Sequence, residues 1–294
     1  MELTTYAIPA YILLILIEIV SYRFIPDEEE QGYTVRDTAA SLSMGLGYVA
    51  LNLGWSLLYL AAYEGVQDLT PLHMDAGASW LAAIGVFVGW DFLYYWEHRA
   101  DHRVRILWAS HINHHSSRRF NFSTALRQPW TGIGNLPFGL PLVLLGFSPA
   151  AVFTAQSANL LYQFWIHTER IDKLWRPVEL VMNTPSHHRV HHGSNRRYLD
   201  RNFAGVFIVW DRLFHTFTPE TEPVVYGLTV NIDTYNPLRV AFHEYAAIGR
   251  DLRTVSSLKD RYAVLFGSPG KAYSAVRRAR EAAATAGAAT AATA

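Results

Sequence analysis

The sequence has 294 residues, with 25 Lys and Arg residues balanced by 25 Asp and Glu residues, so bulk charge indicates neither a nucleic-acid partner nor an acidic substrate. Half of the residues are apolar and only 17% are charged, against about 25% in an average soluble domain. This imbalance predicts a protein of the lipid bilayer. The absence of cysteine excludes disulfide frameworks, thiolate metal sites, iron–sulfur clusters and cysteine nucleophiles. Any bound metal must therefore have nitrogen and oxygen ligands.

Three apolar segments in the first hundred residues are long enough to be transmembrane helices. They run from Tyr6 to Tyr22, interrupted only by Glu18, from Ala39 to Tyr63, and from Ser79 to Trp96. No basic residue precedes the first segment and no small-residue cleavage site follows it, so we expect a retained helix rather than a signal peptide. The polar stretch 26–31 (PDEEEQ) would connect it to the second segment.

A fourth apolar segment, Leu136 to His167, is broken at 146–149 (GFSP). Its first half is too short to cross a hydrocarbon core of about 30 Å, so we predict a tight or re-entrant helical hairpin. Basic residues gather in the segments between these runs that carry the histidines, whereas 64–78 has three acidic residues and no Lys or Arg. By the positive-inside rule, we expect an integral protein of the bacterial inner membrane with its histidines facing the cytoplasm.

We expect residues 1–280 to form one membrane-embedded, all-α domain of four to five spanning or re-entrant helices, with a helical cytoplasmic cap. The histidine-containing core covers about residues 85–218, and a short β-like run occupies 203–209. The Ala- and Thr-rich stretch 281–294 has no apolar stripe to bury, so we expect a frayed helix or a disordered tail.

Ten of the thirteen histidines lie between His98 and His192. Within each motif they are spaced by three or four residues, which places imidazoles on one face of a helix, where they can share a metal ion. The predicted ligands are His98, His102, His111, His114, His115, His188, His191 and His192, joined by the isolated His167 and by His187, which is either a further ligand or a neighbour of His188.

Eight to ten imidazoles exceed the four ligands of a tetrahedral zinc ion, so their number predicts two metal ions. Spacing does not identify the metal, because imidazole binds zinc, copper, iron and nickel alike. Isolated histidines such as His73, His215 and His243 are interpreted as surface or packing residues.

Several acidic and amide side chains near these motifs are predicted to support the site by holding ring N–H groups. Asp91 lies two turns before His98 inside an apolar helix, where an unpaired carboxylate is costly, so we assign it a catalytic role together with Asn183. Further candidates are Glu97, Asp101, Asn121, Glu169 and Asp211.

The motif-bearing segments resemble the fatty acid hydroxylase/sterol desaturase superfamily and, within it, the alkylglycerol monooxygenase branch. They are 90–102 (WDFLYYWEHRADH), 111–128 (beginning HINHHSS), 163–169 (QFWIHTE), 183–193 (NTPSHHRVHHG) and 210–217 (WDRLFHTF). The resemblance covers about residues 91–218. It implies a centre of two iron ions, held by the eight motif histidines and His167, that uses O2 to hydroxylate or desaturate a lipid such as a fatty acyl chain, an ether lipid or a sterol.

The sequence contains no dinucleotide-binding glycine motif after a predicted strand and no ligands for an iron–sulfur cluster. We therefore expect electrons to come from outside the chain, from a reduced pterin or a redox partner protein. Two other classes remain as alternatives: a histidine-rich membrane protein that binds or transports metal without oxygenase activity, and a zinc hydrolase.

Overall fold

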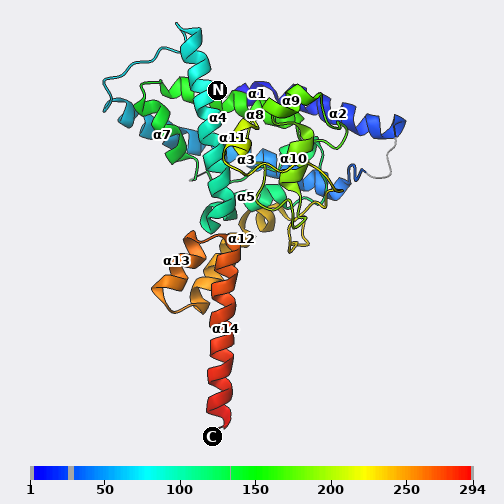
Figure 1. The fold of residues 1–294 in the computed structure, drawn as a ribbon, viewed down its shortest axis with the longest axis vertical. Helices are drawn as coiled ribbons and strands as arrows, with labels where there is room; N and C mark the ends of the chain where they lie inside the picture. Colours follow the sequence, from blue (N-terminus) through cyan, green and yellow to red (C-terminus); the bar gives the residue numbers. More distant parts are fainter. Residues whose placement is uncertain (1–2, 26–29, 133, 293–294) are drawn as a thin grey trace.

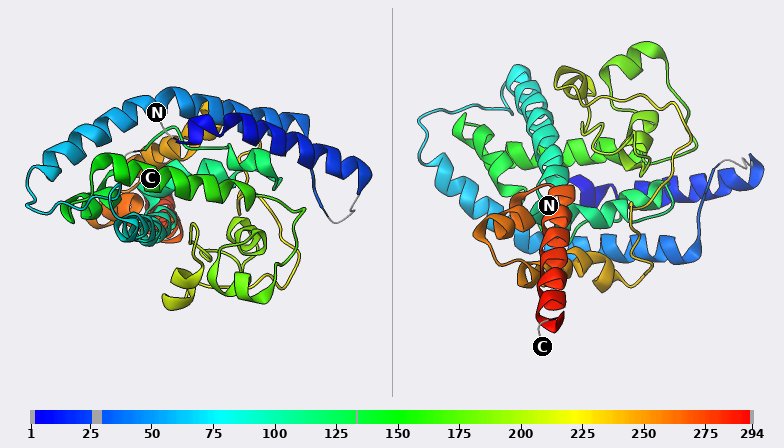
Figure 2. Two further views of the ribbon diagram at one scale, coloured as in Figure 1. Left: turned by 90° about the horizontal axis from the view of Figure 1, so that it is seen from above. Right: turned by 60° about the horizontal axis from the view of Figure 1, so that its bottom comes forward.

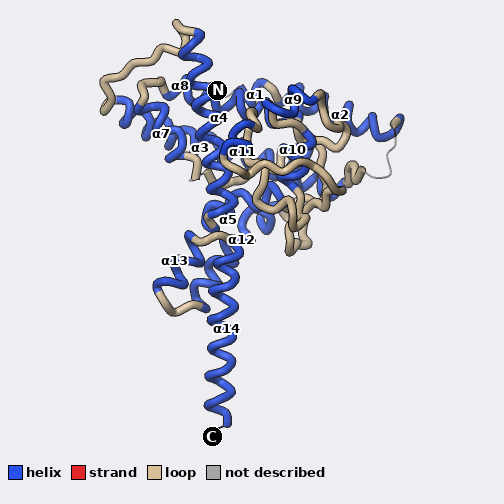
Figure 3. Tube along the Cα trace, viewed as in Figure 1, coloured by secondary structure: helices blue, strands red, loops and turns tan. Residues whose placement is uncertain are grey.

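The computed structural model describes residues 3–25, 30–132 and 134–292, and within these ranges the chain forms helices and loops without a β-strand (Figures 1 and 3). The predicted all-α fold is therefore confirmed. The predicted connector 26–31 lies largely outside the described residues. The helices that carry the predicted apolar segments are α1 (Leu3–Tyr6), α2 (Ile8–Phe24), α3 (Val35–Gln67), α4 (Trp80–Arg103), α7 (Leu136–Leu144) and α8 (Pro149–Trp165).

Each predicted apolar segment forms a helix or a helical pair, and α7 and α8 form the hairpin expected from the break at 146–149. Gly146 takes a φ of +93°, which favours glycine, and its carbonyl accepts a hydrogen bond from Met74. Ser148 then caps α8 by accepting from the backbone N–H of Ala151, and Pro149 begins the helix.

Among the described residues, α3 alone is long and apolar enough to cross a membrane by length and composition. A bundle of four to five spans therefore stays a prediction. Helices α2 and α3 form a layer on one side of the molecule, and the short helices α9 (Arg176–Val181), α10 (Pro185–His192) and α11 (Val209–Leu213) lie on the opposite side (Figure 2, left). Between them, α4 packs against α5, α7 and α8, and its Trp90 is buried beside Tyr63 of α3 and Leu142 of α7.

The short helices are α5 (Arg105–His115), α6 (Phe122–Ala125), α9 (Arg176–Val181), α10 (Pro185–His192) and α11 (Val209–Leu213). The β-like run predicted at 203–209 is wrong, because residues 203–208 form a loop with one isolated bridge, between Phe207 and Met182. The N–H groups of this loop donate to the carboxylates of Asp91 and Asp211 instead of to a neighbouring strand.

The C-terminal helices are α12 (Pro237–Thr254), α13 (Leu258–Phe266) and α14 (Pro269–Ala292). Arg105, at the start of α5, is fully buried and donates to Glu244 and Asp251 of α12 at 2.7 and 2.8 Å, which ties these helices to the histidine-bearing region. Helix α14 projects away from the rest of the molecule (Figure 1). It continues through the Ala- and Thr-rich stretch to Ala292, and residues 281–285 are exposed.

Candidate metal centre

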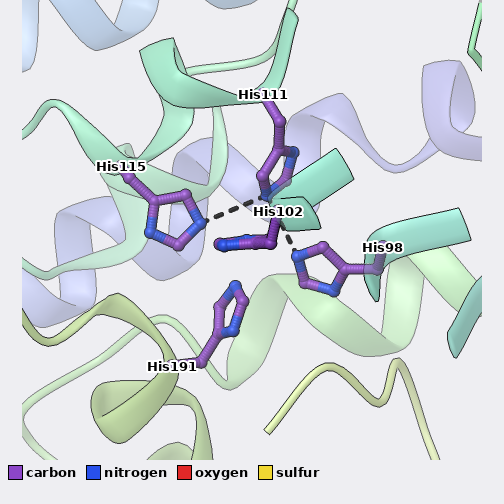
Figure 4. A group of neighbouring side chains, drawn as sticks. All are labelled: His98, His102, His111, His115 and His191. Atoms are coloured by element: carbon purple, nitrogen blue, oxygen red, sulfur yellow. Dashed lines mark hydrogen bonds between the residues drawn. The ribbon is translucent and has the colours of Figure 1, made fainter. Parts of the chain in front are cut away.

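The first group of imidazoles consists of five rings whose nitrogens face a common centre (Figure 4). One ring nitrogen from each residue lies within 4.8 Å of those of the others. The closest approaches join His111 Nε2 to His98 Nε2 at 3.0 Å and to His115 Nε2 at 3.2 Å. The members are His98 and His102 of α4, His111 and His115 of α5, and His191 of α10.

The second group consists of four buried imidazoles that meet the same limit of 4.8 Å. Its members are His114 of α5, His188 and His192 of α10, and His167, which follows the end of α8. His167 lies in the middle of the group, because its Nε2 is 3.1 Å from His114 Nε2 and 2.9 Å from His188 Nε2. The structure thus brings the isolated histidine of the sequence into the centre of a second site.

Adjacent histidines of one motif go to different groups. In α5, His111 and His115 face the first group, whereas His114 faces the second; in α10, His188 and His192 face the second group and His191 the first. Successive residues of an α-helix are rotated by about 100°, so residues four apart share a face and a direct neighbour points elsewhere. Helices α5 and α10 therefore contribute to both groups.

Four of the rings are fixed by hydrogen bonds to backbone carbonyls. In each of these bonds the histidine Nδ1 lies close to a carbonyl oxygen: His98 to Phe203 O (2.8 Å), His114 to Arg127 O (3.3 Å), His167 to Gln163 O (2.7 Å) and His191 to Arg201 O (3.0 Å). Because a carbonyl only accepts, each Nδ1 must carry the hydrogen, and the Nε2 lone pair is free to bind a metal ion.

Burial keeps these imidazoles neutral, which is the form that binds metals. It lowers the pKa of His191 to about 4 and that of His167 to about 3. The Nε2 atoms of His102, His191 and His192 are buried and have no hydrogen-bond partner in the protein. Neutral rings, fixed tautomers and unpartnered Nε2 atoms fit the requirements of a site for two metal ions.

His187 lies outside both groups. Its Nε2 is 2.9 Å from a carboxylate oxygen of Glu179, so it joins the start of α10 to the short helix α9. In the structure it is therefore a neighbour of His188 that faces an acid, rather than a member of the clustered rings.

Asp91 and Asn183 hold the loop 203–208 and contact neither histidine group directly. The buried Asp91 carboxylate accepts from Asn159 (2.6 Å), Trp210 (2.8 Å) and the N–H groups of residues 206 and 207 (2.7 and 3.0 Å). The Asn183 amide donates to the carbonyls of residues 204 and 205. Since Phe203 O accepts from His98, both residues are positioned to orient a ring from a distance.

The remaining acidic and amide candidates are placed differently from one another. Asp211 accepts from the N–H groups of residues 203 and 204 at 2.8 Å each, and so supports the same loop. Asp101 Oδ2 lies 4.0 Å from His111 Nδ1. Glu169 accepts from the N–H of Gln31, and Asn121 caps α6. Glu97 is buried beside the first group.

Two supporting residues were not predicted as parts of the site. Arg127, whose carbonyl accepts from His114, is buried and donates to Asp37 at 2.7 Å. Glu18, seen in the sequence only as an interruption, is buried and bonds to Thr168, the residue after His167. The position of Glu18 in an apolar helix could have predicted a supporting role, since a carboxylate there needs a partner. No pattern in the sequence predicted the role of Arg127, whose partner Asp37 is 90 residues away.

A cavity of about 860 Å³ lies between α2, α3, α4, α5 and α8. Most of its lining residues are apolar, including Leu53 and Leu57 of α3. His111 of the first group and His114 and His167 of the second group form part of its wall. Both groups therefore face one apolar space, whose volume is in the usual range of small-molecule sites.

Comparisons with known proteins match this geometry to a family. The fatty acid hydroxylase profile matches residues 83–216, which include every histidine of the two groups. The chain is 42% identical over 269 residues to alkylglycerol monooxygenase of Homo sapiens, covering 90% of this chain and 59% of that protein. It is 35% identical to the Caenorhabditis elegans protein of the same name, over 75% of this chain and 44% of that one.

A bacterial relative, ornithine lipid hydroxylase of Rhizobium tropici, is 27% identical over 67% of this chain and 61% of its own length. The chain thus spans less than two thirds of the length of these relatives. No solved structure matches the chain. The motif resemblance is confirmed, because residues 83–216 of the chain match the fatty acid hydroxylase family.

Proposed function

We propose that the chain is a membrane lipid hydroxylase that uses O2 and two iron ions, one held by each histidine group. The observation that carries this proposal is that both groups of neutral imidazoles line one apolar cavity. A metal transporter would need polar groups along a path, whereas this cavity is bordered mainly by leucines and other apolar side chains.

The choice of iron rests on what the motif resemblance implies, because imidazole groups alone also suit zinc and copper. The relatives named as a monooxygenase and a lipid hydroxylase support oxygen chemistry. When bound, a pair of iron ions with O2 supplies the oxidising power for attack on a C–H bond. His98, His102, His111, His115 and His191 would hold one ion, and His114, His167, His188 and His192 the other.

The protein's own contribution is orientation and exclusion of water. Hydrogen bonds from Nδ1 to backbone carbonyls keep the rings in place, and Asp91, Asn183 and Asp211 hold the loop 203–208, which provides the carbonyl that accepts from His98. The apolar wall would take an alkyl chain and position one of its carbons near the histidines that line the cavity.

The relatives named for alkylglycerols and for an ornithine lipid suggest a substrate with an alkyl or acyl chain and a polar headgroup. Since the chain lacks cysteine for an iron–sulfur centre, electrons would come from a reduced pterin or a redox partner protein. We place the protein in a membrane through its apolar helices, with the histidine groups on the cytoplasmic side.

A turnover assay tests this function. The purified, iron-loaded protein is supplied with O2, a chemical reductant and a set of membrane lipids, and the products are identified by mass spectrometry. We expect one oxygen atom from ¹⁸O2 in a lipid product. An unsaturated product without ¹⁸O would show a desaturase instead, and tight zinc binding with unchanged lipids would support the metal-binding or hydrolase alternatives.

A further inference from the structure

In the lining of the cavity, α4 presents two carboxyl groups one helical turn apart. Glu97 and Asp101 both line the cavity, as does His111. The Asp101 carboxylate lies 4.0 Å from His111 Nδ1, so the pair borders the first histidine group directly. The two acids are separate from the ring nitrogens that face the metal positions.

Glu97 is only 3% exposed, and its Oε2 is buried without a hydrogen-bond partner among the described residues. The other buried acids behave differently: Asp91 accepts four hydrogen bonds, and Glu244 is paired with Arg105. A buried carboxylate without a donor is unfavourable and is rare in folded proteins. Its persistence next to a cavity indicates that a ligand supplies the donor.

None of the residues that line the cavity is Lys or Arg, so no side-chain cation of the cavity pairs with these two acids. The nearby hydroxyl groups of Ser110 and Tyr245 also line the cavity, but they bond to Thr131. An anionic headgroup would bring no hydrogen-bond donor to the buried Glu97 Oε2, whereas an O–H or N–H group would satisfy it.

We propose that Glu97 and Asp101 form a headgroup subsite that binds a hydrogen-bond-donating lipid headgroup, hydroxyl or ammonium, and rejects anionic headgroups such as a carboxylate. This inference rests on the proposed function only in taking the cavity's ligand to be a lipid. It narrows the substrate class to lipids with a polyol or an amine at the end held near the first histidine group.

The test is equilibrium binding of three ligands that share one hexadecyl chain length: 1-O-hexadecylglycerol, hexadecylamine and palmitate, each titrated into purified protein in detergent at pH 8. We expect the glycerol ether or the amine to bind at least about tenfold more tightly than palmitate, the scale of the cost of leaving a buried polar atom without a hydrogen bond. The tighter of the two identifies hydroxyl or ammonium as the preferred donor.

Glu97→Leu and the double change Glu97→Gln with Asp101→Asn should remove this preference, whereas Glu64→Gln, a carboxyl-to-amide change on the exposed face of α3, should keep it. Glu97→Leu should also raise the melting temperature, since it removes an unpartnered buried acid. A purely structural glutamate would lower the melting temperature when replaced. If Glu97→Leu does not fold, the double amide variant carries the test.

Palmitate binding as tightly as the other two ligands, or a preference that survives both variants, would overturn the headgroup subsite. Because binding needs no turnover, the two proposals fail separately. Loss of ¹⁸O incorporation with an intact headgroup preference counts against the hydroxylase alone, and normal hydroxylation without any headgroup preference counts against the subsite alone.

Discussion

The two histidine groups are built from the same helices but are supported in different ways. The five-ring group relies on the carbonyls of Arg201 and Phe203, which accept from His191 and His98. The four-ring group relies on the carbonyls of Arg127 and Gln163, which accept from His114 and His167. Because the supports lie on different segments, mutations should disturb one metal position at a time.

The largest difference is expected when a ring is removed from each group. His188→Ala leaves three imidazoles in the four-ring group, whereas His102→Ala leaves four in the five-ring group. We expect His188→Ala to reduce bound iron from about two ions to about one per chain and lipid hydroxylation by roughly 100-fold or more. His102→Ala should retain more iron. Metal analysis and turnover of the same samples measure both effects.

His73→Ala, in an exposed position, is the control for these changes and should alter neither iron content nor turnover. Equal retention of two irons in His188→Ala and in the wild type would contradict the assignment of His188 as a ligand.

The spacing of the histidines along the sequence predicted which rings pair on one helical face. It did not predict which rings belong to the five-ring group and which to the four-ring group. The pairs four residues apart, such as His98 with His102, share a group as helical geometry requires. The assignment of His114 and His191 to opposite groups depends on how α5 and α10 pack, which no spacing records. Likewise, the chain indicated that Asp91 needs partners, yet two of these partners, the N–H groups of residues 206 and 207, lie 115 and 116 residues away in a loop that was predicted to be β-like.

A second comparison separates the supports. Asp211→Asn weakens the carboxylate that holds residues 203 and 204, next to the carbonyl that fixes His98. We expect about tenfold weaker iron binding at the five-ring group, the low end of losses for outer partners of metal ligands. The four-ring group should keep its iron. Competition with a chelator, followed by metal analysis, measures the two affinities.

The matched change for the four-ring group replaces Arg127 with Met and Asp37 with Leu together, so that no buried charge is left unpaired. Here the weaker position should be the one bound by His114. If Asp211→Asn and the double variant each lose iron equally from both positions, the two histidine groups do not have separate supports.

Low pH should destabilise the metal-free protein through the histidines of both groups. In the metal-free protein, the unfolded chain takes up protons on histidine near pH 6.5, whereas burial lowers the pKa of folded His191 to about 4 and that of His167 to about 3. The unfolded state therefore binds more protons in between, so the free energy of unfolding falls as the pH drops from about 6.5 toward about 4. Melting temperatures that stay constant across this range would contradict neutral, buried rings.

The smallest effect is expected at His187. His187→Gln keeps a side chain that can donate to Glu179 and removes only an imidazole that faces neither group. We expect unchanged iron content and a loss of stability of about 1 kcal/mol or less, the scale of one hydrogen bond. A loss of iron comparable to that of His188→Ala would instead make His187 a ligand.

The central claim is that the nine clustered histidines bind two iron ions. Its most direct test is the metal content of the purified full chain, measured by mass spectrometry against protein concentration after expression with iron. We expect about two iron ions per chain, one for each group of rings. A single metal ion per chain, or zinc in place of iron at full occupancy, would contradict it.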